Sequence, residues 1–461
     1  MRVSDLNSQP LSPLDGRYQS QVSDLAEFFS EAGLNRARVE VEIEWLILLA
    51  DSEYFEVEPF SSQDQAKLRD TYKNFDSDSQ AKIAEIEKTT RHDVKAVEYF
   101  IRDELEKLDL TDKAELIHFS CTSEDINNLS YALVIKSAVE EVWLPKAQEL
   151  AAKLLKMARA NSELGMLSRT HGQPATPTTL GKELRVFEQR LLRQLNRIEN
   201  QDYLGKFSGA TGTFAAHLAA KPEVDWIAES QKFVESLGLQ FNSTTTQIEP
   251  HDWQAELYQA IAHSNRILHN LATDVWFYIS LGYFKQTPVE GATGSSTMPH
   301  KINPIRFENA EANFEISNAI LDSLNQTLVT SRLQRDLTDS SAQRNIGVGF
   351  GHSLLAIDNI NRGLDELEVD RVAIRADLID AWEVLAEAVQ TVIRAEVSEG
   401  KSNIDDPYAM LKQLTRGKGI DQESLLTFIN GLDISQEAKD RLMMMQPENY
   451  VGLAGKIAEL D

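Results

Sequence analysis

Apolar residues recur at helical spacing along several long stretches of the chain. Between residues 183 and 200 they are separated by three or four positions: Leu184, Phe187, Leu191, Leu195 and Ile198. From residue 257 a similar spacing continues to Gly282 without a proline, through Leu257, Ile261, Leu268, Leu271, Val275 and Tyr278. Such spacing places apolar side chains on one face of a helix. The second stretch predicts a rod of about seven turns.

Two further stretches follow the same rule. Steps of four join Ile316, Ile320, Leu324 and Leu328. Leu129 and Leu133 begin another helix, which Pro145 should kink or end because proline lacks the backbone N–H that an interior helical position needs. No sustained alternation of apolar and polar residues is bounded by Asn-Gly or Asp-Gly turns. We therefore expect little sheet.

Long amphipathic helices bury their apolar faces by lying side by side, and apolar seams that remain would recruit further copies of the chain. The pattern predicts an all-α protein whose central long-helix bundle assembles into a homo-oligomer. Loop-forming residues near 109–113 and 365–370 predict three helical domains, at residues 1–111, 112–364 and 365–461.

Composition narrows the classes of function. The chain has 461 residues, too many for a disulfide-stapled mini-protein, and a formal charge of −26, which opposes attraction to nucleic acid or an anionic membrane. The single cysteine, Cys121, indicates a reducing compartment, and we expect the cytoplasm. We expect neither a transmembrane span nor a signal peptide, because no apolar stretch is long enough and the start of the chain has no apolar core.

The most informative stretch for chemistry is residues 291–309. A glycine- and serine-rich loop leads into Lys301, Asn303 and Pro304, and Pro304 suits the first turn of a helix. Backbone N–H groups at a helix start, together with a lysine, attract a carboxylate. A flexible loop with a solvated lysine is the alternative, but an ordinary linker has no need for this combination.

Other polar segments have a structural and a functional interpretation. Thr122 and Ser123 form a turn that caps the following helix, and such hydroxyls can also bind a carboxylate. Ser340 and Arg344 are four residues apart, on one helical face suited to a phosphate. Arg335 precedes two aspartates, so a surface ion-pair network is its alternative role.

Glycines at 205, 209 and 212 resemble a phosphate loop only superficially, since no strand precedes them and no Gly-Lys-Ser/Thr follows. We expect them to let two segments approach closely. No His-Glu-x-x-His motif or cysteine cluster supports a metal site, so we expect no metal and no cofactor.

The segment from Gly294 to Pro304 resembles the signature loop of the fumarase/aspartase superfamily, whose members eliminate fumarate from a succinyl-bearing substrate. Nearly the whole chain is similar to the bacterial adenylosuccinate lyases within it. The matching segments are residues 15–18, 90–94, 121–125, 168–173, 335–340 with Arg344, and 406–417.

The resemblance implies general acid–base catalysis. Ser295 matches the family's base, with Ser296 as the alternative, and His171 matches the acid that protonates the leaving nitrogen. We expect His171 at a helix end, in an irregular segment. Glu308 would orient this histidine, and Lys301 would stabilise the carbanion-like intermediate.

The resemblance also implies a set of substrate-binding residues: Arg17, Tyr18, Arg91, His92, Asp93, Thr122, Ser123, Thr170, Gln247, Ser296, Met298, Asn303, Arg335, Ser340 and Arg344. His92 could instead be an exposed residue at a helix start. The implied substrates are adenylosuccinate and succinyl-aminoimidazole-carboxamide ribotide, in a homotetramer whose active sites are shared between subunits.

Two alternatives remain open from the sequence. A sister lyase would act on argininosuccinate, malate or aspartate. Arg17, Tyr18, Ser340 and Arg344 argue against it, because only a phosphorylated substrate needs them. A structural homologue would keep the fold without activity, and the intact Ser295, His171, Lys301 and Asn303 argue against that.

Overall fold

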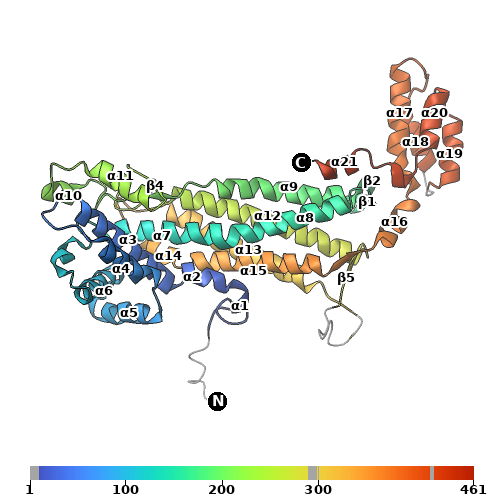
Figure 1. Ribbon diagram of the computed structural model, residues 1–461. Coiled ribbons are helices and arrows are strands. Elements are labelled where there is room, and N and C mark those ends of the chain that lie inside the picture. The colour runs from blue at the N-terminus through green and yellow to red at the C-terminus, as the bar shows by residue number, and fades with distance from the viewer. Residues whose placement is uncertain (1–9, 289–297, 299–300, 416–419, 461) are drawn as a thin grey trace. The chain divides into compact units, whose positions relative to one another are not determined.

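The computed structural model describes residues 10–288, 298, 301–415 and 420–460, and helices dominate it (Figure 1). Three of the predicted helices are present: α9 (Leu180–Glu199), α12 (Asp252–Ser280) and α13 (Ile305–Leu328). The predicted stripe of α9 is buried from Leu184 to Ile198. Helix α13 begins directly after Pro304, so the predicted helix start is confirmed to within one residue.

The N-terminal part of the described chain contains short and medium helices: α1 (Gln19–Val22), η2 (Ser23–Leu25), α2 (Ala26–Phe29), α3 (Glu31–Asp51), α4 (Ser62–Lys73), α5 (Ser77–Thr90), α6 (Asp93–Lys107), η3 (Thr111–Leu116) and α7 (Ser123–Ser137). The middle adds η4 (Ala138–Trp143), α8 (Leu144–Ala160), α10 (Ala215–Ala220), α11 (Trp226–Ser236), α14 (Thr338–Gln343) and α15 (Ile346–Asp365). The C-terminal part contains α16 (Arg371–Ile379), η5 (Trp382–Leu385), α17 (Ala386–Ser398), α18 (Pro407–Thr415), α19 (Gln422–Asn430), α20 (Gln436–Met443), η6 (Pro447–Asn449) and α21 (Ala454–Glu459).

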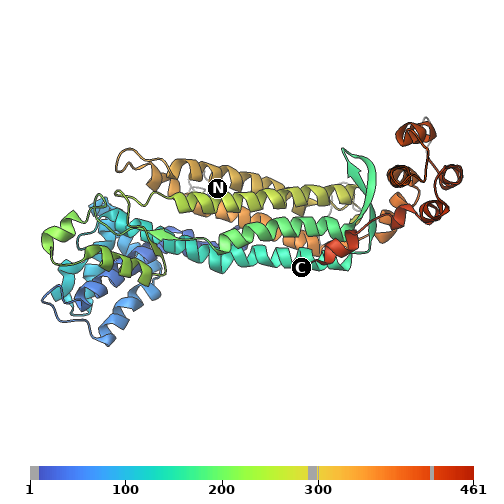
Figure 2. The same cartoon turned by 90° about the horizontal axis from the view of Figure 1, so that it is seen from above.

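Buried polar bonds join the long helices. Asn265 of α12 donates to Ser317 Oγ of α13 at 3.1 Å and accepts from Ser353 Oγ of α15 at 2.7 Å. Trp143 Nε1 donates to the same Ser353 hydroxyl at 2.8 Å. These buried groups have partners, so the helices can pack at a polar layer without the cost of unpaired atoms. Helices α9 and α12 lie side by side in both views (Figures 1 and 2), and Arg190 joins Asn270 across them at 3.0 Å.

Two details of the helix predictions differ from the structure. Pro145 neither ends the helix nor stands inside a regular one: α7 widens into the π-helical turn η4, and α8 resumes just before the proline. A π turn changes the hydrogen-bond register where proline offers no donor. On α13, Ile316 is 45 % exposed, whereas Phe314 and Leu321 are buried, so the predicted stripe only partly coincides with the buried face of this chain.

Sheet is limited to three two-stranded pairs in the described chain, as predicted. β1 (Gly165–Thr170) and β2 (Gln173–Thr179) form an antiparallel hairpin, β3 (Leu204–Gly205) pairs in parallel with β4 (Gln240–Phe241), and β5 (Phe284–Gln286) pairs antiparallel with β6 (Leu367–Val369). The hairpin corrects one prediction. His171 lies at its two-residue turn and not at a helix end, since both His171 and Gly172 have the positive φ that a tight hairpin turn requires.

Close packing divides the chain into two compact units. Unit 1 contains residues 1–148, 194–266 and 310–358, and unit 2 contains residues 149–193, 267–309 and 359–461. Within unit 2, the C-terminal helices enclose their own apolar core, formed by residues such as Leu385, Ile393, Leu425 and Leu442. The predicted three domains follow chain order and stay a prediction.

Glycines permit close approach where the sequence suggested it. A β-carbon at Gly205 would collide with the Leu129 side chain, and one at Gly212 would collide with the backbone oxygen of Thr245. Gly212 also has a φ of 75°, which L side chains rarely adopt. None of the helices in the described chain is both long and apolar enough to cross a bilayer.

Candidate active site

A polar cavity of about 500 Å³ in unit 1 collects many of the predicted substrate-binding residues. We call it the arginine cavity. Its lining consists of Arg38, His92, Asp93, Thr122, Ser123, Glu124, Asn127, Tyr131, Gln247, Arg335, Leu337, Ser340, Ser341 and Arg344. Eight of these were predicted from the sequence: His92, Asp93, Thr122, Ser123, Gln247, Arg335, Ser340 and Arg344. The cavity therefore unites segments that are more than 200 residues apart in the chain.

Helix starts form one side of this cavity. Thr122 caps α7 in a capping box with Asp125, whose carboxylate accepts the Thr122 N–H at 2.8 Å. His92 caps α6, and its Nδ1 accepts the Lys95 N–H at 3.3 Å. Thr122 is therefore a helix cap and His92 an exposed residue at a helix start, as their structural interpretations predict. The same two residues also line the cavity. Two helix N-termini direct positive potential towards this region.

Arg38 is a cavity residue that sequence reasoning missed. It lies within α3 and is 1 % exposed; its guanidinium donates to Asn127 at 2.9 Å, to Asn35 at 2.9 Å and to Asp93 at 2.7 Å. Burial alone would raise the pKa of Asp93, but the charge of Arg38, a backbone hydrogen bond and Arg344 outweigh it and lower that pKa below its ordinary value.

Arg335 and Arg344 bring two more guanidinium groups to the cavity. Arg335 pairs with Glu124 at 2.7 Å and donates to Ser340 Oγ at 3.0 Å. Arg344 pairs with Asp93 at 3.2 Å and also with Glu31. The cavity thus holds three arginines whose carboxylate partners keep the local charge balanced. Such forked donors suit a phosphate or carboxylate ligand.

The predicted acid lies in unit 2. His171 is exposed at the hairpin turn, and the adjacent Thr170 lines another cavity, of about 950 Å³, between the hairpin, the end of α12 and residues 451–457. Arg169, two residues before His171, pairs with Asp377 at 2.5 Å and donates to the Tyr283 hydroxyl at 2.9 Å. The histidine thus sits on a short, anchored hairpin.

The residues that the structure describes include only part of the signature loop. Ser295 and Ser296 lie outside the described residues, Met298 and Lys301 are exposed, and Asn303 is half-buried. Glu308 of α13 accepts a hydrogen bond from Trp276 Nε1 at 3.1 Å. Among the described residues no hydrogen bond joins Glu308 to His171 within the chain. The predicted orienting role of Glu308 stays a prediction.

Three further predicted binding residues of unit 1, namely Arg17, Tyr18 and Arg91, do not line the arginine cavity. Arg17 is exposed, with its guanidinium 5.9 Å from the Tyr18 ring centroid. Their neighbours Asp15 and Gln19 line a smaller cavity, of about 220 Å³, whose lining includes Arg344. Arg91 is exposed in a left-handed conformation just after α5. Arg344 therefore borders both this smaller cavity and the arginine cavity.

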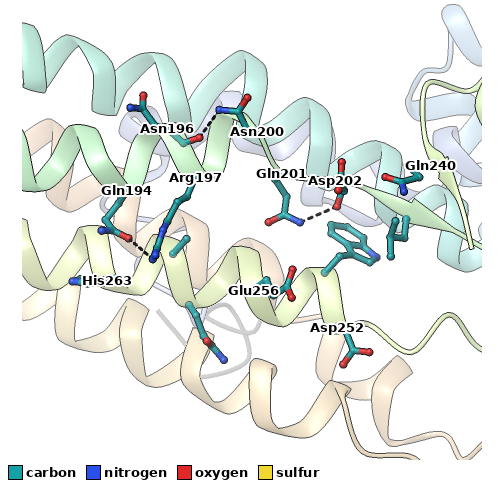
Figure 3. A pocket seen from close by; sticks show the side chains of 14 residues that line it. Gln194, Asn196, Arg197, Asn200, Gln201, Asp202, Gln240, Asp252, Glu256 and His263 are labelled. Atoms are coloured by element: carbon teal, nitrogen blue, oxygen red, sulfur yellow. Dashed lines mark hydrogen bonds between the residues drawn. The ribbon is translucent and has the colours of Figure 1, made fainter.

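Another cavity, of about 850 Å³, lies in unit 1 between the end of α9 and the start of α12 (Figure 3). Its walls are mostly exposed amide and charged side chains, among them Asn196, Arg197 and Glu256, and none of the predicted site residues lines it. In the described part of the chain, no group of histidine, cysteine or acidic residues is arranged to hold a metal ion.

Comparisons with known proteins place this geometry in a family. A family described as Lyase matches residues 16–315, and a family described as Adenylosuccinate lyase C-terminal matches residues 331–451. The adenylosuccinate lyase of Haemophilus influenzae is 47 % identical over 461 residues, covering 100 % of this chain and 99 % of that protein. The adenylosuccinate lyase of Escherichia coli K12 is 48 % identical over 456 residues, covering 98 % of each chain.

The fold agrees with these matches. The crystal structure of a fumarate lyase from Mesorhizobium sp. BNC1 matches with a TM-score of 0.74 and 19 % identity, covering 95 % of this chain and 96 % of that one. The protein is thus a lyase with the fold of the fumarate lyases. Within that class, the chain belongs to the adenylosuccinate lyase family.

Proposed function

We propose that this chain eliminates fumarate from adenylosuccinate to give AMP, and from succinyl-aminoimidazole-carboxamide ribotide to give the carboxamide ribotide. The observation that carries the proposal is the arginine cavity, which combines three guanidinium groups with hydroxyls at a helix start. Both substrates carry a phosphate and two carboxylates, and these are the groups that such donors bind. Both full-length relatives described above are named adenylosuccinate lyase.

The proposed chemistry is a proton transfer at each end of the breaking bond. Ser295 removes the proton from the carbon next to a carboxylate, and the carbon–nitrogen bond then breaks with its electron pair moving to nitrogen. His171 gives its proton to that nitrogen. One proton leaves the carbon and one reaches the nitrogen, so forming fumarate and the amine involves no net gain or loss of protons. Lys301 and Asn303 stabilise the negative charge that builds up on the carboxylate before the bond breaks. Gln247, Thr122 and Ser123 hold the succinyl carboxylates, while Arg335, Ser340 and Arg344 hold the phosphate.

We further propose a homotetramer with active sites shared between subunits, acting in the cytoplasm. Large apolar side chains remain exposed on three long helices: Val186 on α9, Phe277 on α12, and Ile305 and Ile316 on α13. Large exposed apolar side chains on long helices favour association with further copies. Sharing would also allow Glu308 and His171 of different copies to meet. Sedimentation velocity should give a single species of four chains, and a monomer would reject this part of the proposal.

The test of the reaction is the ultraviolet absorbance change when purified protein is mixed with adenylosuccinate, with fumarate and AMP identified by NMR. Argininosuccinate, malate and aspartate serve as comparison substrates. Fumarate release from one of these and not from adenylosuccinate would favour a sister lyase. No turnover of any substrate would favour a structural homologue.

The His171→Asn variant tests the acid. Asparagine tolerates the positive φ of this turn but cannot donate a proton as imidazolium does, so the hairpin should keep its shape. We expect kcat to fall by about 10²–10⁴-fold, the usual contribution of a general acid. The melting temperature should stay within about 2 °C, since a solvent-exposed turn contributes little to stability. Retained turnover with a large loss of melting temperature would identify a structural histidine instead.

A further inference from the structure

A fully buried ion pair binds the backbone of two residues that line the arginine cavity. Lys206 and Asp125 are both 0 % exposed, and Lys206 Nζ lies 2.7 Å from Asp125 Oδ1. The remaining two donors of Lys206 are used on backbone oxygens, Gly209 O at 2.8 Å and Gln247 O at 2.9 Å. All three ammonium hydrogens therefore have partners, which a buried lysine requires.

Both carboxylate oxygens of Asp125 also accept hydrogen bonds from backbone N–H groups. Its Oδ2 accepts the N–H of Thr122 at 2.8 Å, and its Oδ1 accepts the N–H of Ser208 at 2.9 Å. The N–H of Gly209 lies within 3.2 Å of both oxygens. One carboxylate thus fixes the start of α7 and the 208–209 segment together.

These contacts reach two cavity residues from distant parts of the chain. Asp125 holds the backbone of Thr122, and Lys206 holds the backbone of Gln247, whose side-chain amide also donates to Ala210 O at 2.9 Å. We propose that the Lys206–Asp125 pair is a positioning pair, which sets the separation of Thr122 and Gln247 around the succinyl group of the substrate. The inference rests on the proposed function, because it assigns these two residues to the succinyl carboxylates.

Stability alone does not explain such a pair. Replacing a buried ion pair by apolar residues of similar volume is often neutral for stability, because desolvation cancels the Coulomb gain. The distinctive property of this pair is geometric: each charge also binds backbone groups of a cavity wall, which an apolar pair cannot do. Displacing a binding group by about 1 Å is enough to weaken transition-state or substrate binding strongly.

The decisive variant is Asp125→Asn. Its amide oxygen can still accept from Lys206 and Ser208, but its NH₂ group cannot accept the N–H of Thr122, so the start of α7 is released while the fold remains. The Lys206→Met/Asp125→Leu double variant removes both charges and releases Gln247 as well. We expect KM for adenylosuccinate to rise about tenfold in Asp125→Asn and further in the double variant, with a smaller change in kcat.

A matched control is the buried pair Arg185–Glu188 on α9, at 2.5 Å and with side chains 6 % and 2 % exposed, in unit 2. Arg185→Met/Glu188→Leu should change the melting temperature by a similar amount and leave KM unchanged. An unchanged KM in folded Asp125→Asn, or an equal rise in the control, would overturn the positioning role.

Hydrogen exchange provides a readout that needs no substrate. The amides of residues 122–124 should exchange faster in Asp125→Asn, and those of residues 245–248 should also exchange faster in the double variant. Change confined to residues 206–210 would overturn the inference even if the wild-type protein proved inactive on adenylosuccinate. If the wild type is inactive but both segments loosen, the proposed function fails and the positioning pair stands.

Discussion

Arg344 carries two acidic neighbours at the border of the arginine cavity. Its guanidinium binds Glu31, at the first residue of α3, and Asp93, and the side chains of Arg344 and Glu31 are 42 % and 46 % exposed. In the function proposed above, the substrate phosphate binds the same donors and therefore competes with Glu31. On that proposal, Glu31 sets how strongly Arg344 attracts the phosphate.

Glu31→Gln should lower KM for adenylosuccinate, because the amide leaves Arg344 its positive charge but competes less. An exposed ion pair is worth up to about 1 kcal/mol, which corresponds to a decrease of up to about fivefold in KM. Steady-state kinetics measure the effect, and kcat should stay constant. Glu27→Gln, which removes a partner of Arg36 instead, is the control and should change neither constant. A rise in KM would show that Glu31 supports the site.

Among individual residues, the sequence predicts those that belong to compact motifs, such as Thr122 and Ser340, and both line the arginine cavity. It missed Arg38, which lies in no motif. The signal was present nonetheless: α3 is buried around most of its circumference, and a charged residue in such a helix must have buried partners. Those partners, Asn35, Asn127 and Asp93, are separated by up to 92 residues from one another, so no local pattern could name them.

The β1–β2 hairpin shows how an element positions one side chain. Arg169 on β1 is tied to Asp377 of α16 and to Tyr283, and the Tyr283 hydroxyl also binds Asp377. Burial, followed by the hydrogen bond to Asp377, raises the pKa of Tyr283 to about 12, so the hydroxyl stays a donor at all ordinary pH values. On β2, Thr176 donates to Glu387 of α17 at 2.5 Å.

Asp377→Asn should lower kcat by about tenfold with little change in KM, because it loosens the strand that carries His171 without touching the arginine cavity. The amide can still accept one hydrogen bond, so the melting temperature should fall by only a few degrees. Asp380→Asn, an exposed position just after α16, is the matched control and should behave as wild type. A rise in KM with unchanged kcat would contradict this role for the hairpin anchor.

Helices were predictable because their apolar period extends over many residues, as in α9 and α12. The hairpin was not, because each strand is short, its turn is His-Gly, and a bulge interrupts the register between Met166 and Ser168. The π turn before Pro145 depends on the register of the whole helix. Pro145 predicts that the helix is disturbed there, but it does not predict that the disturbance is a π turn.

The apolar pattern of one chain does not show how copies of that chain assemble. The exposed face of Ile316 on α13 belongs to the stripe that the sequence predicted as buried. An apolar stripe in a sequence shows that a face is covered, but it does not show whether its cover is the same chain or another copy. This is why the helices were predicted well and the faces that each buries were predicted only in part.

A buried histidine links the whole molecule's stability to pH. His217 is 0 % exposed, its ring lies against Phe214 and Trp226, and both ring nitrogens are without a hydrogen-bond partner. Burial lowers its pKa from 6.5 to about 4. In the unfolded chain the histidine has its ordinary pKa. Below a pH of about 6.5 the unfolded state therefore binds a proton that the folded state does not bind. The stability is therefore complete above that value and is lost as the pH falls towards about 4.

His217→Phe should remove this loss, because a phenyl ring fits the aromatic surroundings and takes up no proton. Urea unfolding at pH 7.5 and at pH 5 measures it: relative to wild type, the variant should gain about 1.4 kcal/mol per pH unit on the acid side. Protonation of the many carboxylates changes self-repulsion equally in both proteins, so the difference between them isolates the histidine. A pH-independent difference between His217→Phe and wild type would instead mean that His217 takes up a proton in the folded protein as readily as in the unfolded chain.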